Sequence, residues 1–249
     1  MATVSDTRIF SAVYKAMSDA IFEGSAPTTM VQAGQRIVRA SRRSFVVDGN
    51  NKPAYAKLRE CLVVRDGGSD DGNANRFSGR SPDGSVNAGG VYFSMHNEPM
   101  FMELRHYNPD SSVVRALKNG VVLSIEVTAP LLVLDMSRHS GNAQQFLRSI
   151  SRNPDVRAVA GMDSLYDQMM NPNDFSVSRA IGLAVGRHRY LDGMLVQTAR
   201  TDPEQRSGDN LVLFGKKGQV VSKKLRIRSA VVFKMRKGPG QLDIETYHY

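Results

Sequence analysis

The first segment of the chain carries its apolar residues at the three- and four-residue spacing of an amphipathic helix. The apolar face consists of Ile9, Phe10, Val13, Met17 and Ile21. Ser5 is a suitable N-cap and Gly24 a suitable stop, so the pattern predicts a helix from Ser5 to Glu23. Acidic residues on its polar face disfavour a membrane surface, and we expect the helix to pack on the rest of the protein.

Alternating and short apolar runs further along the chain predict strands, and longer periodic segments predict helices. Strands are expected at 36–40, 90–94, 121–127, 131–134, 194–197, 210–214, 225–233 and 242–246. Helices are expected at 98–107, 142–152 and 163–170, and from Ser176 onward. Because the strands and helices show no regular βαβ repeat, the pattern predicts a mixed α+β fold. Residues 66–90 form a Gly- and Asp-rich connection, whose length is typical of a functional or disordered loop.

Positive charge is concentrated toward the end of the chain. The net charge is +9, and residues 210–242 hold nine Lys and Arg residues without an Asp or Glu. Around Lys224, Arg226 and Arg228 the alternation puts the basic side chains on one face of a strand. Two interpretations stay open: a solvated basic face, or a surface for nucleic acid, an acidic partner or a phosphorylated ligand.

Several classes of site and protein are excluded by the sequence. The single cysteine, Cys61, rules out an intramolecular disulfide and a cysteine-cluster zinc site. The five histidines share no metal-ligand spacing, and Walker, G-x-S-x-G, H-E-x-x-H and Rossmann motifs are missing. We therefore expect no metal. The most apolar stretch, residues 121–134, is too short to span a bilayer, so we expect a protein without membrane association.

A carboxylate follows the strand at 90–94 on the edge of a helix. Asn97 is a good N-cap, Pro99 is tolerated in the first turn, and Glu103 then lies at the margin of the apolar face. Helix geometry alone favours a surface ion pair between Glu103 and Arg105 or Arg115.

Four motifs in order nevertheless resemble the RES domain, a family of bacterial toxins. They are "RIVRAS" with Arg39, "NRFSG" and "GGVYFS" with Arg76, Phe77 and Tyr92, "EPMFMEL" with Glu103, and "DGMLVQTARTDPEQRSGDNLVLF" with Thr198. The match covers roughly residues 34–216, and the closing motif is its most specific part. Thr198 stands where the family has a serine and keeps the hydroxyl. Arg36 is a rival for the first arginine.

The resemblance implies a compact, ADP-ribosyltransferase-like mixed sheet with flanking helices. It implies three parts: an N-terminal helical extension at 1–33, an NAD+-binding catalytic domain at 34–216, and basic C-terminal strands at 217–249 packed on that domain. The implied function is a toxin that depletes NAD+ by hydrolysis or phosphorolysis of the nicotinamide–ribose bond. NAD+ is then a substrate and no cofactor is needed. A protein antitoxin or immunity protein is the implied partner. The implied location of this protein is the cytoplasm of the producing cell, or the cytoplasm of a target cell to which it is delivered without a cleaved signal peptide.

The resemblance also assigns roles to individual residues. Glu103 would stabilise the cationic ribosyl transition state through a ribose hydroxyl. Arg39 would bind the pyrophosphate bidentately, with Arg76 as a second phosphate ligand. Tyr92 would stack on the nicotinamide or ribose, and Thr198 would hydrogen-bond the ribose.

Other functions stay open from the sequence. A related enzyme would transfer ADP-ribose to a protein. A protein of a different class would bind nucleic acid through residues 210–242, although Phe214 and Phe233 are the only aromatic residues there. The helix at residues 5–23 is a candidate for self-association.

Overall fold

The structure is a computed structural model, which describes residues 4–42, 52–64, 77–82, 84, 87–96, 120–137, 141–160, 164–171, 174–197, 209–235 and 242–249. The helices are α1 (Val4–Phe22), α2 (Tyr55–Glu60), α5 (Gly141–Ser151), α6 (Pro154–Arg157), α7 (Leu165–Met170) and α8 (Ser176–Arg187). The strands are β1 (Thr28–Val31), β2 (Arg36–Arg42), β3 (Gly79–Arg80), β4 (Asn87–Ser94), β5 (Gly120–Val127), β6 (Leu131–Met136), β7 (Gly193–Gln197), β8 (Asp209–Gly215), β9 (Leu225–Met235) and β10 (Leu242–His248). The protein is therefore α+β, as predicted.

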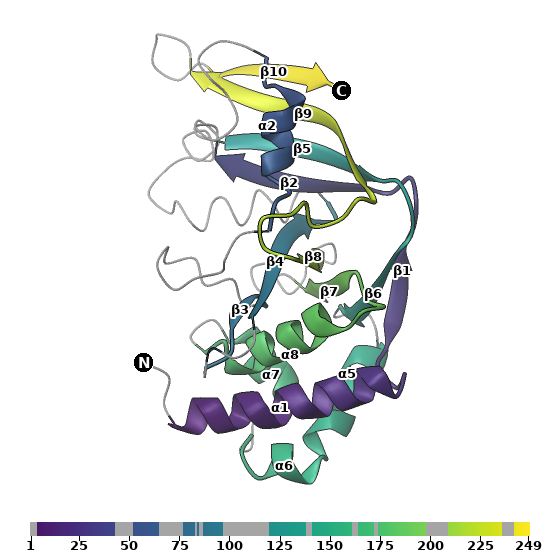
Figure 1. The fold of residues 1–249 in the computed structure, drawn as a ribbon, viewed down its shortest axis with the longest axis vertical. Helices are drawn as coiled ribbons and strands as arrows, with labels where there is room; N and C mark the ends of the chain where they lie inside the picture. The colour runs from purple at the N-terminus through teal and green to yellow at the C-terminus, as the bar shows by residue number, and fades with distance from the viewer. Residues whose placement is uncertain are drawn as a thin grey trace.

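Within the described residues, the strands form one ten-stranded sheet in the order β1-β6-β7-β8-β4-β2-β5-β9-β10, with β3 beside β4. All of these pairings are antiparallel except that of β6 with β7. Figure 1 shows α1, α5, α6, α7 and α8 gathered at one end of the molecule, whereas α2 lies against β5 and β9 near the other end.

The two faces of the sheet carry separate cores. Val91 and Phe93 of β4 pack in one core with Leu58 and Leu62 of the α2 segment, on what we call the α2 face. The intervening residue, Tyr92, packs against the other core, which contains α1 and α8; we call this the α8 face. The division follows from the two-residue period of a strand, which sends successive side chains to opposite faces.

Helix α1 contributes directly to the α8-face core. Val13 and Met17 have no exposed surface and belong to the same cluster as Ile181 and Val185 of α8. The helical pattern of residues 5–23 therefore predicted both the helix and the face that it buries.

Most predicted elements are confirmed to within a few residues, and four shorter ones were not predicted: β1, α2, β3 and α6. The predicted helix at 98–107 lies outside the described residues. None of the helices that the structure describes is long and apolar enough to cross a membrane. Cys61 is buried and is a free thiol.

Candidate functional site

The structure describes three of the six residues predicted for the site. Arg39 lies in β2, Tyr92 lies in β4, and Phe77 precedes β3. Arg76, Glu103 and Thr198 lie outside the described residues.

Arg39 is bonded to the main chain of Tyr92. Its Nη1 donates a hydrogen bond to the Tyr92 carbonyl oxygen at 2.7 Å, and its guanidinium lies 5.9 Å from the centre of the Phe93 ring. Strands β2 and β4 share one register pair in the described residues, Val38 with Ser94. The Arg39 side chain therefore joins the two strands just beyond the point where their backbone pairing ends.

Tyr92 in turn holds Phe77. The Tyr92 phenol oxygen accepts a hydrogen bond from the Phe77 amide at 2.8 Å. The Phe77 side chain is 2% exposed and belongs to the α8-face core, so its ring is enclosed by protein. Arg39, Tyr92 and Phe77, which come from two separate sequence motifs, thus form one chain of hydrogen bonds.

The side chains of Arg39 and Tyr92 nevertheless lie on opposite faces of the sheet. Arg39 is paired with Leu123 of the α2-face core and lies against Phe93 of the same core. Tyr92 packs against the α8-face core. The two residues meet through the Tyr92 carbonyl group rather than side chain to side chain.

The strand directions bring the carboxyl ends of β4 and β7 to one end of the sheet. Both β4 and β7 are antiparallel to β8, so they run parallel to each other with β8 between them. Near their carboxyl ends, Ser94 and Val196 flank Asn210, and Ser94 Oγ donates to Asn210 Oδ1 at 3.2 Å. With strands about 4.8 Å apart, these ends are separated by about 10 Å. The chain continues from β4 toward Glu103 and from β7 directly into Thr198.

Two glycines of α8 allow this helix to lie close to the site. A Cβ on Gly182 would lie 1.8 Å from the Phe77 carbonyl oxygen, and one on Gly186 would lie 2.7 Å from the Ala88 Cβ. Gly90 of β4 similarly leaves room for Ser78, whose Cβ would be 3.2 Å from an added methyl group. This contact was not predicted, although the four-residue spacing of Gly182 and Gly186 on one helix was a usable signal.

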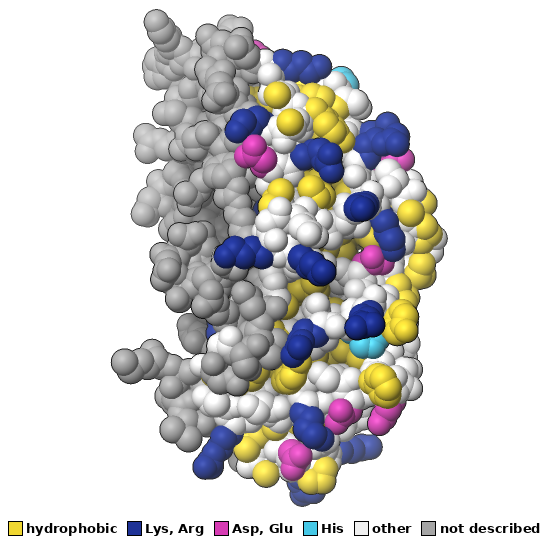
Figure 2. Space-filling model, in the orientation of Figure 1, with side chains coloured by type: hydrophobic (Ala, Val, Ile, Leu, Met, Phe, Trp, Pro, Cys, Tyr) yellow, Lys and Arg dark blue, Asp and Glu magenta, His cyan; other side chains and the backbone are white. Residues whose placement is uncertain are grey.

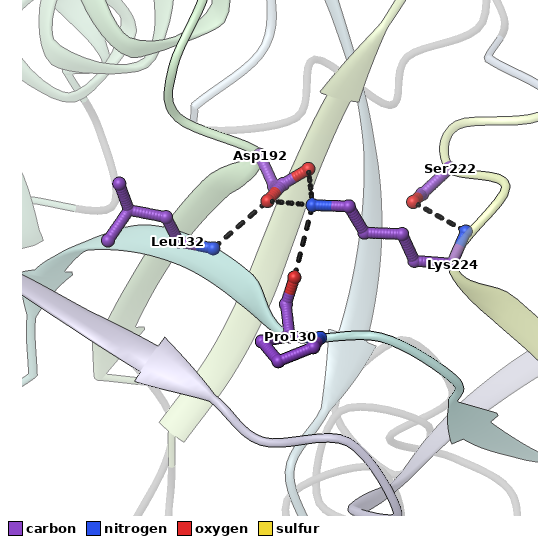
Figure 3. A network of polar contacts seen from close by, with 5 residues as sticks. All are labelled: Pro130, Leu132, Asp192, Ser222 and Lys224. Carbon is purple, nitrogen blue, oxygen red and sulfur yellow. Dashed lines mark hydrogen bonds and ion pairs between the residues drawn. The ribbon is translucent and has the colours of Figure 1, made fainter.

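Asp192, the first residue of the closing motif, has a structural partner in the basic segment. Figure 3 shows its carboxylate accepting hydrogen bonds from the Leu132 amide at 2.9 Å and from Lys224 Nζ at 2.8 and 3.0 Å. Lys224 Nζ also donates to the Pro130 carbonyl oxygen at 3.0 Å. The next residue, Gly193, lies so close to β8 that a Cβ would be 2.1 Å from the Val212 carbonyl oxygen. These contacts set the start of β7, the strand that leads to Thr198.

A second ion pair involves the basic segment. Arg228 Nε donates to Glu126 Oε2, and this hydrogen bond lowers the pKa of Glu126, with smaller contributions from the charges of Arg226 and Arg36. The same hydrogen bond raises the pKa of Arg228. Lys224 and Arg228 are thus both paired with carboxylates, and the face seen in Figure 2 carries scattered Lys and Arg side chains rather than one continuous basic area.

The part of the chain that the structure describes contains no group of three or more His, Cys, Asp or Glu side chains able to hold a metal ion.

No family model, curated protein or solved structure matches this chain.

Proposed function

We propose that this chain cleaves the nicotinamide–ribose bond of NAD+, as a toxin with an ADP-ribosyltransferase-like core. The candidate catalytic residues are Glu103, Arg39, Tyr92 and Thr198, with Arg76 as a second phosphate ligand. The acceptor of the ADP-ribosyl group is water or phosphate, and a protein antitoxin or immunity protein is the proposed partner.

The supporting observation is the convergence of separate motifs at one place in the sheet. The parallel strands β4 and β7 end on either side of Asn210 and lead toward Glu103 and into Thr198. Arg39 is hydrogen-bonded to β4 two residues before that strand ends. Arg39, the end of β4 and the end of β7 belong to three motifs that are far apart in the sequence, and they therefore lie near the same part of the sheet.

The proposed chemistry needs negative charge more than proton transfer. The bond between ribose C1′ and the nicotinamide nitrogen breaks, its electron pair leaves with neutral nicotinamide, and an oxygen of water or phosphate then bonds to C1′ and loses its proton. Positive charge develops on the ribose in between. A preorganised carboxylate at Glu103 would stabilise this charge by about 3 kcal/mol, by analogy with a single oxyanion-hole donor.

The arginines and the hydroxyl would hold the substrate. An arginine binds phosphate oxygens in a fixed, bidentate geometry that lysine does not offer. In this proposal Arg39 binds the pyrophosphate and Thr198 hydrogen-bonds the ribose beside Glu103.

The test is to incubate the purified protein with NAD+, with and without phosphate, and to identify the products by mass. We expect nicotinamide together with ADP-ribose, or with its phosphorylated form when phosphate is present. Glu103→Gln is expected to lower turnover at least about 100-fold. The matched control is Glu23→Gln, an exposed glutamate just beyond α1. Equal turnover in wild type and Glu103→Gln would overturn the proposal.

A labelled adduct on a macromolecule, without release of ADP-ribose, would instead identify a protein ADP-ribosyltransferase. Nucleic-acid binding through residues 210–242 is less well supported. Phe233 is 6% exposed and Phe214 is partly buried against the α8-face core, so neither ring is fully open to stacking.

A further inference from the structure

Strand β1 lies at one end of the sheet that the structure describes. Its register partners are all in β6, from Thr28 with Leu134 to Val31 with Leu131. Figure 1 shows β1 at the margin of the sheet, with no labelled strand on its outer side. Among the described residues, β1 therefore presents a row of backbone N–H and C=O groups that β6 does not use.

The neighbouring Pro27 shows which residues form this outer row. The Asp135 amide donates to the Pro27 carbonyl oxygen at 2.9 Å, so these two residues are a hydrogen-bonded pair in the register of β1 and β6. Hydrogen-bonded and non-hydrogen-bonded pairs alternate along an antiparallel ladder. Thr29 therefore bonds to β6, whereas the N–H and C=O groups of Thr28 and Met30 point outward.

The segment that contains β1 carries no charged side chain. None of residues 24–35 is Asp, Glu, Lys, Arg or His, in a chain whose net charge is +9. At the opposite end of the described sheet, β10 carries the carboxylates Asp243 and Glu245. Charged side chains on an edge strand oppose the addition of a further strand. Of these two edges, β1 is therefore the one suited to pair with another uncharged strand.

Exposed apolar side chains accompany this edge. Met30 is 43% exposed, and Phe22, which ends the helix that leads into β1, is 86% exposed. Tyr190 is 78% exposed and lies two residues before Asp192. The Asp192 amide donates to the carbonyl oxygen of Leu132, the register partner of Met30. Three of the five large apolar side chains that the described residues expose thus belong to β1 or to segments that adjoin it, which is typical of a contact surface.

We infer that β1 is the contact through which two copies of this chain associate, with the two β1 strands antiparallel about a two-fold axis. Thr28 of each copy then pairs with Met30 of the other, and the outward N–H and C=O groups of both residues are hydrogen-bonded. Thr29 lies opposite its own counterpart at the axis. A second copy fits this edge because it offers the same uncharged strand, whereas most other surfaces of two chains with a net charge of +9 would repel each other. The inference does not depend on NAD+ cleavage.

The first test is the mass of the full chain in solution, measured by analytical ultracentrifugation over a range of concentrations. We expect wild type to form a dimer. Met30→Lys should raise the dissociation constant of this dimer at least about 100-fold, because the lysine enters the symmetric contact twice. The Met30 side chain is 43% exposed, so the variant should keep the circular dichroism spectrum of wild type.

The matched control is Ile244→Lys, which adds the same charge at a 61% exposed position of β10. It should leave the dissociation constant within about threefold of wild type. A wild-type chain that stays monomeric up to its solubility limit would leave the β1 edge to an extended segment of a different protein and would overturn the inference. A dimer that Met30→Lys leaves as tight as wild type would overturn it as well.

A second variant acts on the backbone of the same edge. Thr28→Pro removes an outward N–H and keeps the hydrogen bonds to β6, since an edge strand tolerates proline where the nitrogen faces away from its neighbour. We expect the dissociation constant to rise at least about tenfold, because one hydrogen bond is lost from each copy. Unchanged affinity in Thr28→Pro protein of normal circular dichroism would count against pairing through β1.

Amide hydrogen exchange identifies the strand that makes the contact. The amides of Thr28 and Met30 should exchange at least about tenfold more slowly in the dimer than in the dilute monomer. The Thr29 amide, which bonds to β6, should be equally protected in both and serves as the internal control. Equal exchange of Thr28 and Met30 in dimer and monomer would show that the copies meet elsewhere, and would overturn the inference.

Discussion

Arg39 and Tyr92 are hydrogen-bonded to each other although their side chains lie on opposite faces of the sheet. The guanidinium of Arg39 lies over Phe93 on the α2 face and reaches the Tyr92 carbonyl oxygen at 2.7 Å. The Tyr92 ring lies on the α8 face and holds Phe77. A substrate bound at the end of β4 would meet the first residue from one side of the sheet and the second from the other.

The first prediction separates the two rival arginines of β2. Arg39→Ala should lower kcat/KM for NAD+ by about 100-fold, since a hydrogen bond to a charged group is worth up to about 3 kcal/mol. Arg36→Ala should stay within about threefold, because Arg36 is paired in register with Glu126 and points away from the α2 face. Steady-state kinetics on both variants gives the answer, and a larger loss in Arg36→Ala would make Arg36 the substrate ligand.

The second prediction concerns the ion pair of Figure 3. Asp192→Ala should lower the free energy of unfolding by about 2 kcal/mol, because it leaves the part-buried Leu132 amide without this acceptor and removes the carboxylate partner of Lys224. Urea unfolding measures the loss. Lys15→Ala, at the exposed pair of Lys15 with Asp19 in α1, is the control and should cost at most about 0.5 kcal/mol. Equal losses would show that Asp192 and Lys224 form an ordinary surface pair.

The third prediction is a pH dependence at Glu126. Its pKa is lower in the folded protein than in the unfolded chain, chiefly because Arg228 donates a hydrogen bond to it. The carboxylate therefore stabilises the fold above the unfolded pKa of about 4.3, and this contribution is lost as the pH falls through the folded-state value. The difference in unfolding free energy between wild type and Glu126→Gln should shrink between about pH 6 and pH 3. A difference that is constant over this range would contradict the prediction.

The fourth prediction tests the close contact at the start of β7. Gly193→Ala should destabilise the protein by at least about 2 kcal/mol, because its Cβ would lie 2.1 Å from a backbone oxygen of β8 that has little room to move. Gly141→Ala, which adds a Cβ in open space, should show no loss. Thermal unfolding of the two variants makes the comparison, and a normal melting temperature for Gly193→Ala would mean that β7 can shift.

The fifth prediction asks whether α1 belongs to the folded core. Met17→Ala should cost about 2 to 5 kcal/mol, since Met17 is fully buried against the core that contains α8. Phe22, the last residue of the same helix, is 86% exposed, so Phe22→Ala should change the free energy of unfolding by less than about 0.5 kcal/mol. Chemical unfolding followed by circular dichroism measures both, and a small effect of Met17→Ala would identify α1 as a loosely attached extension.

Strong periodicity in the sequence predicted the long elements well. The buried stripe of α1 gave both the type of element and its buried face. In β9 the alternation correctly put Ile227 on the buried face opposite Arg226 and Arg228, but a bulge in the pairing with β5 then shifts the pattern, so that Ala230 and Val232 are the next buried residues. The missed elements are short: β1 has four residues and α2 has six. Such segments have too few residues to show a period, and β1 exists because β6 offers it backbone partners.

The resemblance named Arg39, Phe77 and Tyr92 as members of one candidate site, and the structure joins these three residues by hydrogen bonds. Their arrangement was not predicted. The sequence did not indicate that the Phe77 ring is buried, because Phe77 lies against Gly182 of α8, far along the chain. It also did not indicate that the Tyr92 hydroxyl accepts from the Phe77 amide, because that contact depends on how the chain folds back between residues 77 and 92. Asp192 was recognised as part of a motif, but its pairing with Lys224 depends on the sheet order.

The single register pair between β2 and β4 has a consequence for how variants at position 39 are interpreted. On one side of this junction lie β1, β6, β7, β8 and β4, and on the other lie β2, β5, β9 and β10. The hydrogen bond from the Arg39 side chain to Tyr92 therefore helps to hold the two halves of the sheet together, where other neighbouring strands are joined by more backbone pairs. A substitution of Arg39 is a change of architecture as well as of chemistry, and its activity is interpretable only beside its own melting curve.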